Sequence, residues 1–191
     1  MKKHFNAKTI VKAALFLFLL TSSVTFTVAF VHLQTNDRIQ AQSLQAEQAA
    51  MRRVIEAETY EAVYTDGNGN DQLFRAVSES GETVGYLVRT SAMGYGGRVE
   101  ILTGIVAGEV QGVEILDASA ETPGLGQNIL QEGFRNAFRG ISQAPILTRS
   151  VANHANAEVQ ALTGATVSAQ AVVNAVSAAM QLYSAVQGSS S

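Results

Sequence analysis

The chain has 191 residues, enough for one domain with a sizeable core and an additional segment. It contains no cysteine, which excludes disulfides, thiolate nucleophiles, cysteine-ligated zinc and conventional iron–sulfur clusters. All four lysines lie in the first twelve residues, whereas the chain after His32 has nine arginines against sixteen acidic residues, a balance of −7. An acidic body of this kind argues against nucleic acid as a partner.

The first element is an apolar stretch at residues 13–31, nineteen residues without a charge. This length crosses the hydrocarbon core of a membrane. The lysines before it and the acids after it predict a cytoplasmic N-terminus and an extracytoplasmic body in the inner membrane. A cleaved signal peptide is the alternative, with Thr27-Val28-Ala29 as a loose cleavage pattern and the same final location of the body. We expect a basic head over residues 1–12 and an anchor over 13–33.

A Gln-, Ala- and Glu-rich segment follows the anchor and predicts a helical stalk over residues 34–60. Asp66–Asp71 resembles the start of a calcium loop, but the sixth position is Asp71 instead of Gly and the twelfth is Val77 instead of Glu. The Asp-Gly and Asn-Gly pairs instead indicate a hairpin turn between strands. No metal site is predicted.

Short β-branched segments separated by turn residues come next, and they predict an antiparallel sheet because no helical crossover fits between them. The predicted strands are residues 73–77, 83–88, 99–106 and 110–116. Ala107-Gly108-Glu109 is the expected turn between the last two. Together with the helices, this predicts an α+β domain over residues 61–187.

Beyond the sheet we expect a short helix at residues 128–139, with Ile129, Phe134 and Phe138 on one face, and a further strand at 145–148. His154 is expected in a loop without a catalytic role. The strongest helical pattern covers residues 168–187, with Gly188 as its terminator and residues 188–191 as a disordered tail.

The segment Leu162–Ser168 places two hydroxyl residues around a Gly-Ala pair, directly before this helix. A helix start offers unpaired N–H groups and a positive dipole end, which suit a phosphate. The alternative is an ordinary N-terminal cap that binds nothing. Two glycine-bearing loops, residues 93–97 and 121–126, are either tight turns or open binding surfaces, and neither has the spacing of a nucleotide-binding fingerprint.

Three stretches taken in order resemble one family: Gly94-Tyr95-Gly96-Gly97, Glu121-Thr122-Pro123-Gly124-Leu125-Gly126 and Thr163-Gly164-Ala165-Thr166-Val167-Ser168. The chain is similar, over residues 10–187, to the family of covalent-FMN-binding G subunits of Rnf-type ion-translocating electron-transport complexes. The C subunits of the Na⁺-translocating NADH:quinone reductases are the sister family. The family pattern has an Asp where this chain has Gln160, and the sister pattern often has a His where this chain has Ser119.

The resemblance implies that FMN is joined through its phosphate to the hydroxyl of Thr166 by a dedicated flavin transferase. Thr163 and Ser168 would donate hydrogen bonds to the phosphate oxygens. Gly164 and Ala165 would let the phosphate approach the backbone.

The resemblance also places the second glycine loop close to the isoalloxazine ring, where small residues keep the surface open. The residues expected there are Glu121, Thr122, Gly124, Leu125 and Gly126. Tyr95 either stacks on a ring or packs against the protein.

The resemblance implies an electron relay inside a complex that couples electron transfer between ferredoxin and NAD to movement of Na⁺ or H⁺. The chain offers no convincing catalytic residues, so we do not expect catalysis by the chain alone, and its partners would be the other membrane subunits. Three alternatives remain: a component like the C subunit of the Na⁺-translocating NADH:quinone reductase, a membrane-anchored adaptor without flavin, and a secreted flavoprotein reductase.

Overall fold

The computed structural model describes residues 7–67, 71–149 and 157–189. The chain divides into two compact units, Met1–Ala46 and Glu47–Ser191. Helix α1, Ala7–Val54, begins in the first unit and ends in the second. The predicted limits of head, anchor and stalk stay predictions, but the last turns of the expected stalk belong to the second unit.

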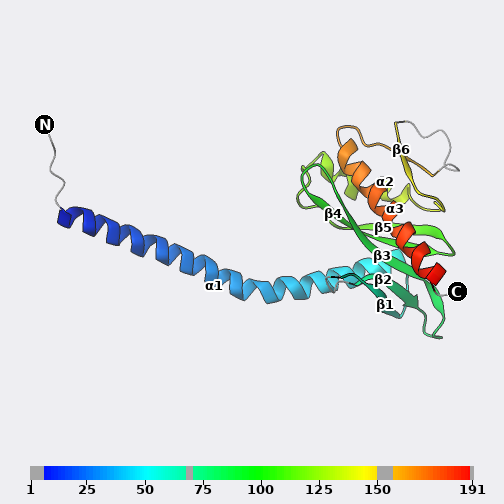
Figure 1. Cartoon of the computed structure of the whole chain (residues 1–191), viewed down its shortest axis with the longest axis horizontal. Helices are drawn as coiled ribbons and strands as arrows, with labels where there is room; N and C mark the ends of the chain where they lie inside the picture. Colours follow the sequence, from blue (N-terminus) through cyan, green and yellow to red (C-terminus); the bar gives the residue numbers. More distant parts are fainter. Residues whose placement is uncertain (1–6, 68–70, 150–156, 190–191) are drawn as a thin grey trace. The chain divides into compact units, whose positions relative to one another are not determined.

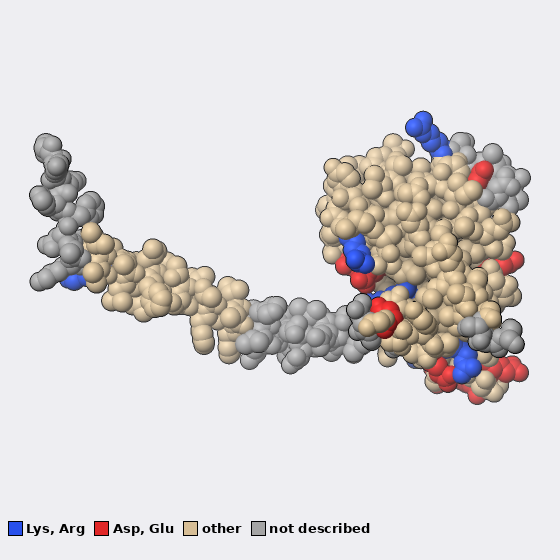
Figure 2. Space-filling model, viewed as in Figure 1, with Lys and Arg blue, Asp and Glu red and all other residues tan. Residues whose placement is uncertain are grey.

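Within the first unit, the segment Ile10–Phe30 is long and apolar enough to cross a membrane, with a mean hydropathy of 2.0 and none of it buried. It is the one such segment among the described residues. Lys12 is its single charged residue, and the helix surface beyond it carries no Lys, Arg, Asp or Glu up to Phe30 (Figure 2). Length and composition therefore agree with the predicted anchor.

The second unit is built on a five-stranded sheet in the order β1-β2-β3-β4-β5, in which every neighbouring pair is antiparallel (Figure 1). The strands are β1 Thr59–Thr65, β2 Asp71–Val77, β3 Thr83–Met93, β4 Arg98–Val106 and β5 Glu109–Asp117. This confirms the α+β class and the antiparallel sheet. The four predicted strands correspond to β2–β5, and β1 forms the other arm of the predicted first hairpin, whose tip at residues 68–70 lies outside the described part.

The β4–β5 connection has the backbone that its sequence predicts. Ala107 and Gly108 adopt φ angles of 51° and 83°. Positive φ at both central residues is the geometry that matches the right-handed twist of the strands.

The sheet separates two cores because side chains alternate between its faces. On β4, Ile101 and Ile105 face the C-terminal helix α3, Thr166–Ser189, which runs across β3 and β4 (Figure 1). Leu102, between them, belongs to the core on the opposite face. There it meets the end of α1, where Met51 and Ile55 are buried.

The end of α1 fits the sheet because the strands carry glycine beneath it. A Cβ added at Gly104 would lie 2.4 Å from Val54 Cγ1, and one at Gly85 would lie 2.8 Å from Ile55 Cδ1. The Tyr60 hydroxyl donates a hydrogen bond of 2.7 Å to the Ile55 carbonyl, which fixes the chain as it turns into β1. Burial raises the pKa of this Tyr60 hydroxyl.

The connection between β5 and α3 contains short elements: η1 Gly126–Leu130, α2 Glu132–Asn136, β6 Ile146–Thr148 and β7 Glu158–Gln160. The predicted helix over 128–139 is divided because Gln131 is extended, with φ −65° and ψ 137°. Its expected apolar face is nevertheless buried at Ile129, Phe134 and Phe138. The predicted strand at 145–148 is β6, which pairs in parallel with the unpredicted β7. His154 lies outside the described residues.

Candidate functional site

The candidate site begins at the turn that leads into α3. The Ala165 amide donates a hydrogen bond of 3.0 Å to the Leu162 carbonyl, and Gly164 between them has φ +77°. This geometry is that of a turn that requires glycine at its third position. Ala165 is buried, and its carbonyl accepts the first helical bond from Ala169 at 2.9 Å. Thr166 is therefore the first helical residue, two positions before the predicted start.

The start of α3 leaves donors available to a ligand. The first N–H groups of a helix have no partner within it. Those of Thr166, Val167 and Ser168 have no other partner in the described part of the chain. The Thr166 side chain is exposed. A helix start of this kind attracts an anion through its N–H groups and its dipole, by about 0.3–1 kcal/mol at an exposed site.

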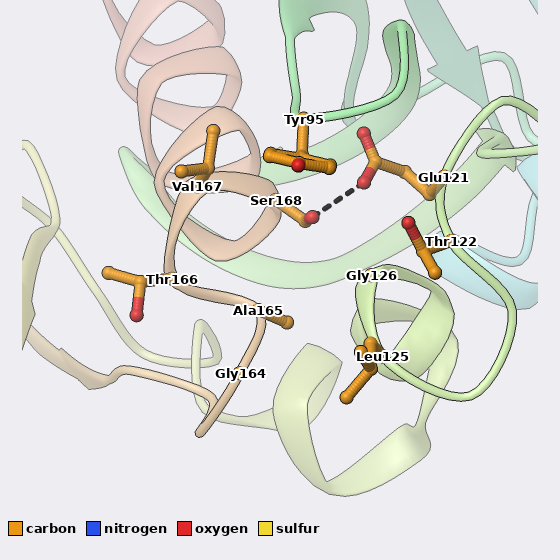
Figure 3. Close-up of a pocket in the computed structure, with 10 residues that line it drawn as sticks. All are labelled: Tyr95, Glu121, Thr122, Leu125, Gly126, Gly164, Ala165, Thr166, Val167 and Ser168. Atoms are coloured by element: carbon orange, nitrogen blue, oxygen red, sulfur yellow. Dashed lines mark hydrogen bonds between the residues drawn. The ribbon is translucent and has the colours of Figure 1, made fainter.

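Beside this helix start lies a cavity of about 580 Å³, within the range of small-molecule sites. Three segments that are distant in sequence form its wall: the β3–β4 loop, the loop after β5 and the first turn of α3 (Figure 3). The residues lining it are Tyr95, Glu121, Thr122, Leu125, Gly126, Gly164, Ala165, Thr166, Val167 and Ser168.

Glu121 connects the three segments. Its side chain is 1% exposed. One carboxylate oxygen, Oε2, accepts a hydrogen bond of 2.6 Å from the Ser168 hydroxyl, and the other, Oε1, accepts one of 3.2 Å from the Gly96 amide. Figure 3 shows the carboxylate beside Tyr95, with its hydrogen bond to Ser168 drawn as a dashed line. A buried carboxylate with partners on both oxygens fits the rule that buried charges are hydrogen-bonded.

Glycines make the space for this carboxylate. A Cβ at Gly94 would lie 2.1 Å from Glu121 Oε1, and a Cβ at Gly126 would lie 2.5 Å from Oε2. At Gly96 it would lie 1.9 Å from the Ala120 carbonyl oxygen. Gly94, Gly96 and Gly126 are therefore required by close packing at Glu121 and the adjoining Ala120.

The cavity rim is apolar and exposed. Tyr95 at the tip of the β3–β4 loop is 76% exposed, and Val167 and Leu125 are 52% and 49% exposed. In Figure 3, Val167 and the Tyr95 ring lie on one side of the opening and Leu125 on the other. An aromatic ring and two aliphatic side chains around a polar floor can accept a flat apolar ring system.

The structure brings nine of the eleven predicted site residues into this wall, and the exceptions are Thr163 and Gly124. Both are exposed. Gly124 has φ +76° with open space around it, so glycine serves the turn there. Val167 also lines the cavity, although it was not predicted as a site residue. The signal that could have identified it is its position as an apolar residue directly after Thr166 at a helix start.

Two expected roles differ in the structure. Ser168 was expected to donate a hydrogen bond to phosphate, but its single hydroxyl proton is directed to Glu121. Gly126 was expected to keep the surface open, but it is buried and gives room to Glu121 and Ser168. Among the described residues, no group of three or more His, Cys, Asp or Glu could hold a metal ion.

Comparison with known families places this cavity in context. Residues 94–181, which include all ten cavity-lining residues, match the FMN-binding domain family. Residues 1–54 match the RnfG N-terminal region. The chain therefore joins an RnfG N-terminal region to an FMN-binding domain.

Curated relatives match nearly the whole chain. The G subunit of the ion-translocating oxidoreductase complex of Methanosarcina acetivorans is 28% identical over 96% of this chain and 99% of its own length. The G subunit of the Na⁺-translocating ferredoxin:NAD⁺ oxidoreductase complex of Acetobacterium woodii is 28% identical over 95% of each chain.

The fold is also found in a solved structure. The C subunit of the Na⁺-translocating NADH-quinone reductase of Parabacteroides distasonis matches with a TM-score of 0.50 and 21% identity. The match covers 60% of this chain and 61% of that one. At this identity the comparison establishes the fold alone.

Proposed function

We propose that the chain is the flavin-carrying electron-transfer subunit of a membrane-bound, ion-translocating ferredoxin:NAD⁺ oxidoreductase complex, and that FMN is attached to Thr166 through a phosphoester. The observation that carries the proposal is the coincidence of the FMN-binding domain match with the cavity at the start of α3. The names of the relatives support the complex, and Na⁺ or H⁺ is the ion that it would move.

The residues present fit FMN. The Thr166 hydroxyl is exposed beside free N–H groups that suit a phosphate, and the apolar rim of Tyr95, Leu125 and Val167 suits a ring system. When bound, FMN supplies the ability to accept and release electrons singly or in pairs. The protein supplies placement, a partly dry surrounding and the charge of the helix start.

Attachment requires a flavin donor whose FMN phosphate is activated by a bond to a second phosphate, and a transferase that uses it. The bond from Thr166 Oγ1 to the FMN phosphorus forms, the bond from that phosphorus to the oxygen of the second phosphate breaks, and the threonine proton leaves with the released group that carries the second phosphate. The product gains the mass of FMN less one water.

The test is the intact mass of the full-length protein after co-expression with a flavin transferase and denaturation. We expect FMN on the wild-type chain and on Thr83→Ala, which removes an exposed threonine outside the cavity, but none on Thr166→Ala. An unmodified wild-type chain, or a modified Thr166→Ala chain, would contradict the proposal. A colourless wild-type protein would support the adaptor alternative.

We further propose that the N-terminus is cytoplasmic and the FMN-binding domain extracytoplasmic in the inner membrane. The basic N-terminal residues and the apolar segment Ile10–Phe30 support this topology. Protease added outside spheroplasts is expected to digest the domain and leave an N-terminal tag intact. A processed chain that lacks its N-terminal tag would instead support the cleaved signal peptide.

A further inference from the structure

We propose that Glu121 is a positioning residue for flavin attachment: its buried carboxylate fixes the rotation of the first turn of α3 and thereby directs the Thr166 hydroxyl outward. The inference rests on the proposed function of Thr166. The family resemblance placed Glu121 close to the isoalloxazine ring. The present proposal instead gives Glu121 a role in orienting Thr166.

The first step is the contact between Glu121 and Ser168. Both side chains are 1% exposed, and their hydrogen bond is 2.6 Å long. The bond joins residues 47 positions apart in the sequence, and it connects the first turn of α3 to the loop after β5, which forms another part of the cavity wall. Ser168 therefore holds the helix start against the loop after β5.

The second step is helix geometry. With 3.6 residues per turn, residues two positions apart point about 200° away from each other around the axis. Ser168 faces inward to Glu121, so Thr166 must face outward, and its side chain is exposed. Val167, between them in sequence, lies on the same side of the opening as the Tyr95 ring in Figure 3.

The third step is the rigidity of Glu121 itself. Its second oxygen accepts the Gly96 amide, and the backbone at Gly94 and Gly126 closes around the carboxylate without space for a Cβ. Its backbone amide donates to the Ala118 carbonyl at 3.0 Å. A side chain confined on all these sides can transmit a fixed orientation to Ser168.

The experiment measures flavin attachment in vitro on purified full-length apo protein in detergent, with a flavin transferase and its flavin donor. Initial rates at several protein concentrations give kcat and KM for the chain as substrate. The variants are Glu121→Gln, Ser168→Ala and their combination, with Glu109→Gln, an exposed glutamate on β5, as the charge control.

A matched stability control separates positioning from general destabilisation. Leu102→Ala removes core volume on the opposite face of the sheet. All rates are measured at least 15 °C below the melting temperature of each variant, which is about four to eight times the shift that a 1 kcal/mol mutation causes in a protein of this size. Partial unfolding lowers the concentration of competent chain and so raises the apparent KM, whereas misplacement of Thr166 lowers kcat.

We expect Glu121→Gln and Ser168→Ala each to lower kcat at least tenfold, with KM little changed. The double variant should be no slower than the slower single variant, because both changes remove the same contact. The controls Glu109→Gln and Leu102→Ala should match the wild type. Rates within twofold of the wild type in folded Glu121→Gln or Ser168→Ala would overturn the inference, as would an equal loss of kcat in Leu102→Ala.

If Glu121→Gln does not fold, Ser168→Ala and Gly126→Ala decide by the same criterion. Gly126→Ala keeps the charge and displaces the carboxylate, because its Cβ would lie 2.5 Å from Oε2. A wild-type chain that is not modified overturns the proposed function and this inference together. Modification of the wild type with unaffected variants overturns the inference alone.

Discussion

The two faces of the sheet pack against helices in different ways: on one face the small residues belong to the helix, and on the other they belong to the strands. On the α3 face, the helix provides small side chains such as Ala179, which packs against large residues of the strands. On the α1 face, the sheet provides Gly85 and Gly104, and the helix end provides Val54 and Ile55. The α3 face also contains the buried carboxylate and the open cavity, whereas the α1 face is closed by apolar contacts with ion pairs at its border.

This difference indicates that stability and function can be changed separately. The cavity residues lie around the start of α3 and two loops, and none of them belongs to the apolar core beneath the end of α1. Substitutions on the α1 face should therefore lower the free energy of unfolding and leave flavin attachment intact in the folded protein.

The largest expected effect is that of Leu102→Ala, in the core between the sheet and the end of α1. Leu102 is fully buried, and its truncation should lower the free energy of unfolding by about 2–5 kcal/mol. Urea unfolding of the full-length protein, followed by circular dichroism, measures the loss. Ile101→Ala, the matched change on the α3 face, should lower the free energy of unfolding by a similar amount. A loss below about 1 kcal/mol for Leu102→Ala would show that the end of α1 is loosely held.

A smaller loss is expected for Gly104→Val. Its Cβ would lie 2.4 Å from Val54 Cγ1 and 3.0 Å from Ile55 Cγ1, so the helix end must move, at a cost of about 1–3 kcal/mol. Faster trypsin cleavage at Arg52 and Arg53 is the specific readout. Gly112→Ala is the control, since its Cβ would lie 3.8 Å from Val54; equal cleavage of both variants would contradict the glycine fit.

Glu114→Gln should have a moderate effect. Glu114 pairs with Arg53 of α1 at 2.9 Å and with Arg135 of α2, and its side chain is 15% exposed. We expect a loss of about 1 kcal/mol, reduced at high salt because Arg53 is largely exposed. Urea midpoints in low and high salt measure it, and a loss that does not depend on salt would point to packing instead of charge.

The smallest effect is expected for Arg75→Gln, on the strand next to the sheet edge. Arg75 pairs with Glu61 of β1, and both side chains are about half exposed. Solvent screens such a pair, so the urea midpoint should not change measurably. A clear loss of stability would show that the β1–β2 hairpin depends on this ion pair.

The sequence by itself determined the parts of the molecule whose signals are local. Residues 13–31 indicated an anchor by length, the β2–β5 strands were visible from β-branched segments and turn residues, and the hydroxyl residues of Leu162–Ser168 indicated the start of a helix. The short strand β7 escaped prediction because three residues carry no period and its partner β6 lies across a loop.

The tertiary structure decided which of the site residues face one another. A buried glutamate has no local signature, since its burial depends on donors that arrive from the β3–β4 loop and from α3. Sequence reasoning therefore placed Ser168 on the phosphate and Gly126 on an open surface, although both surround Glu121. Composition and periodicity fix how each segment folds, but hydrogen bonds between distant segments form only where packing removes water from both partners.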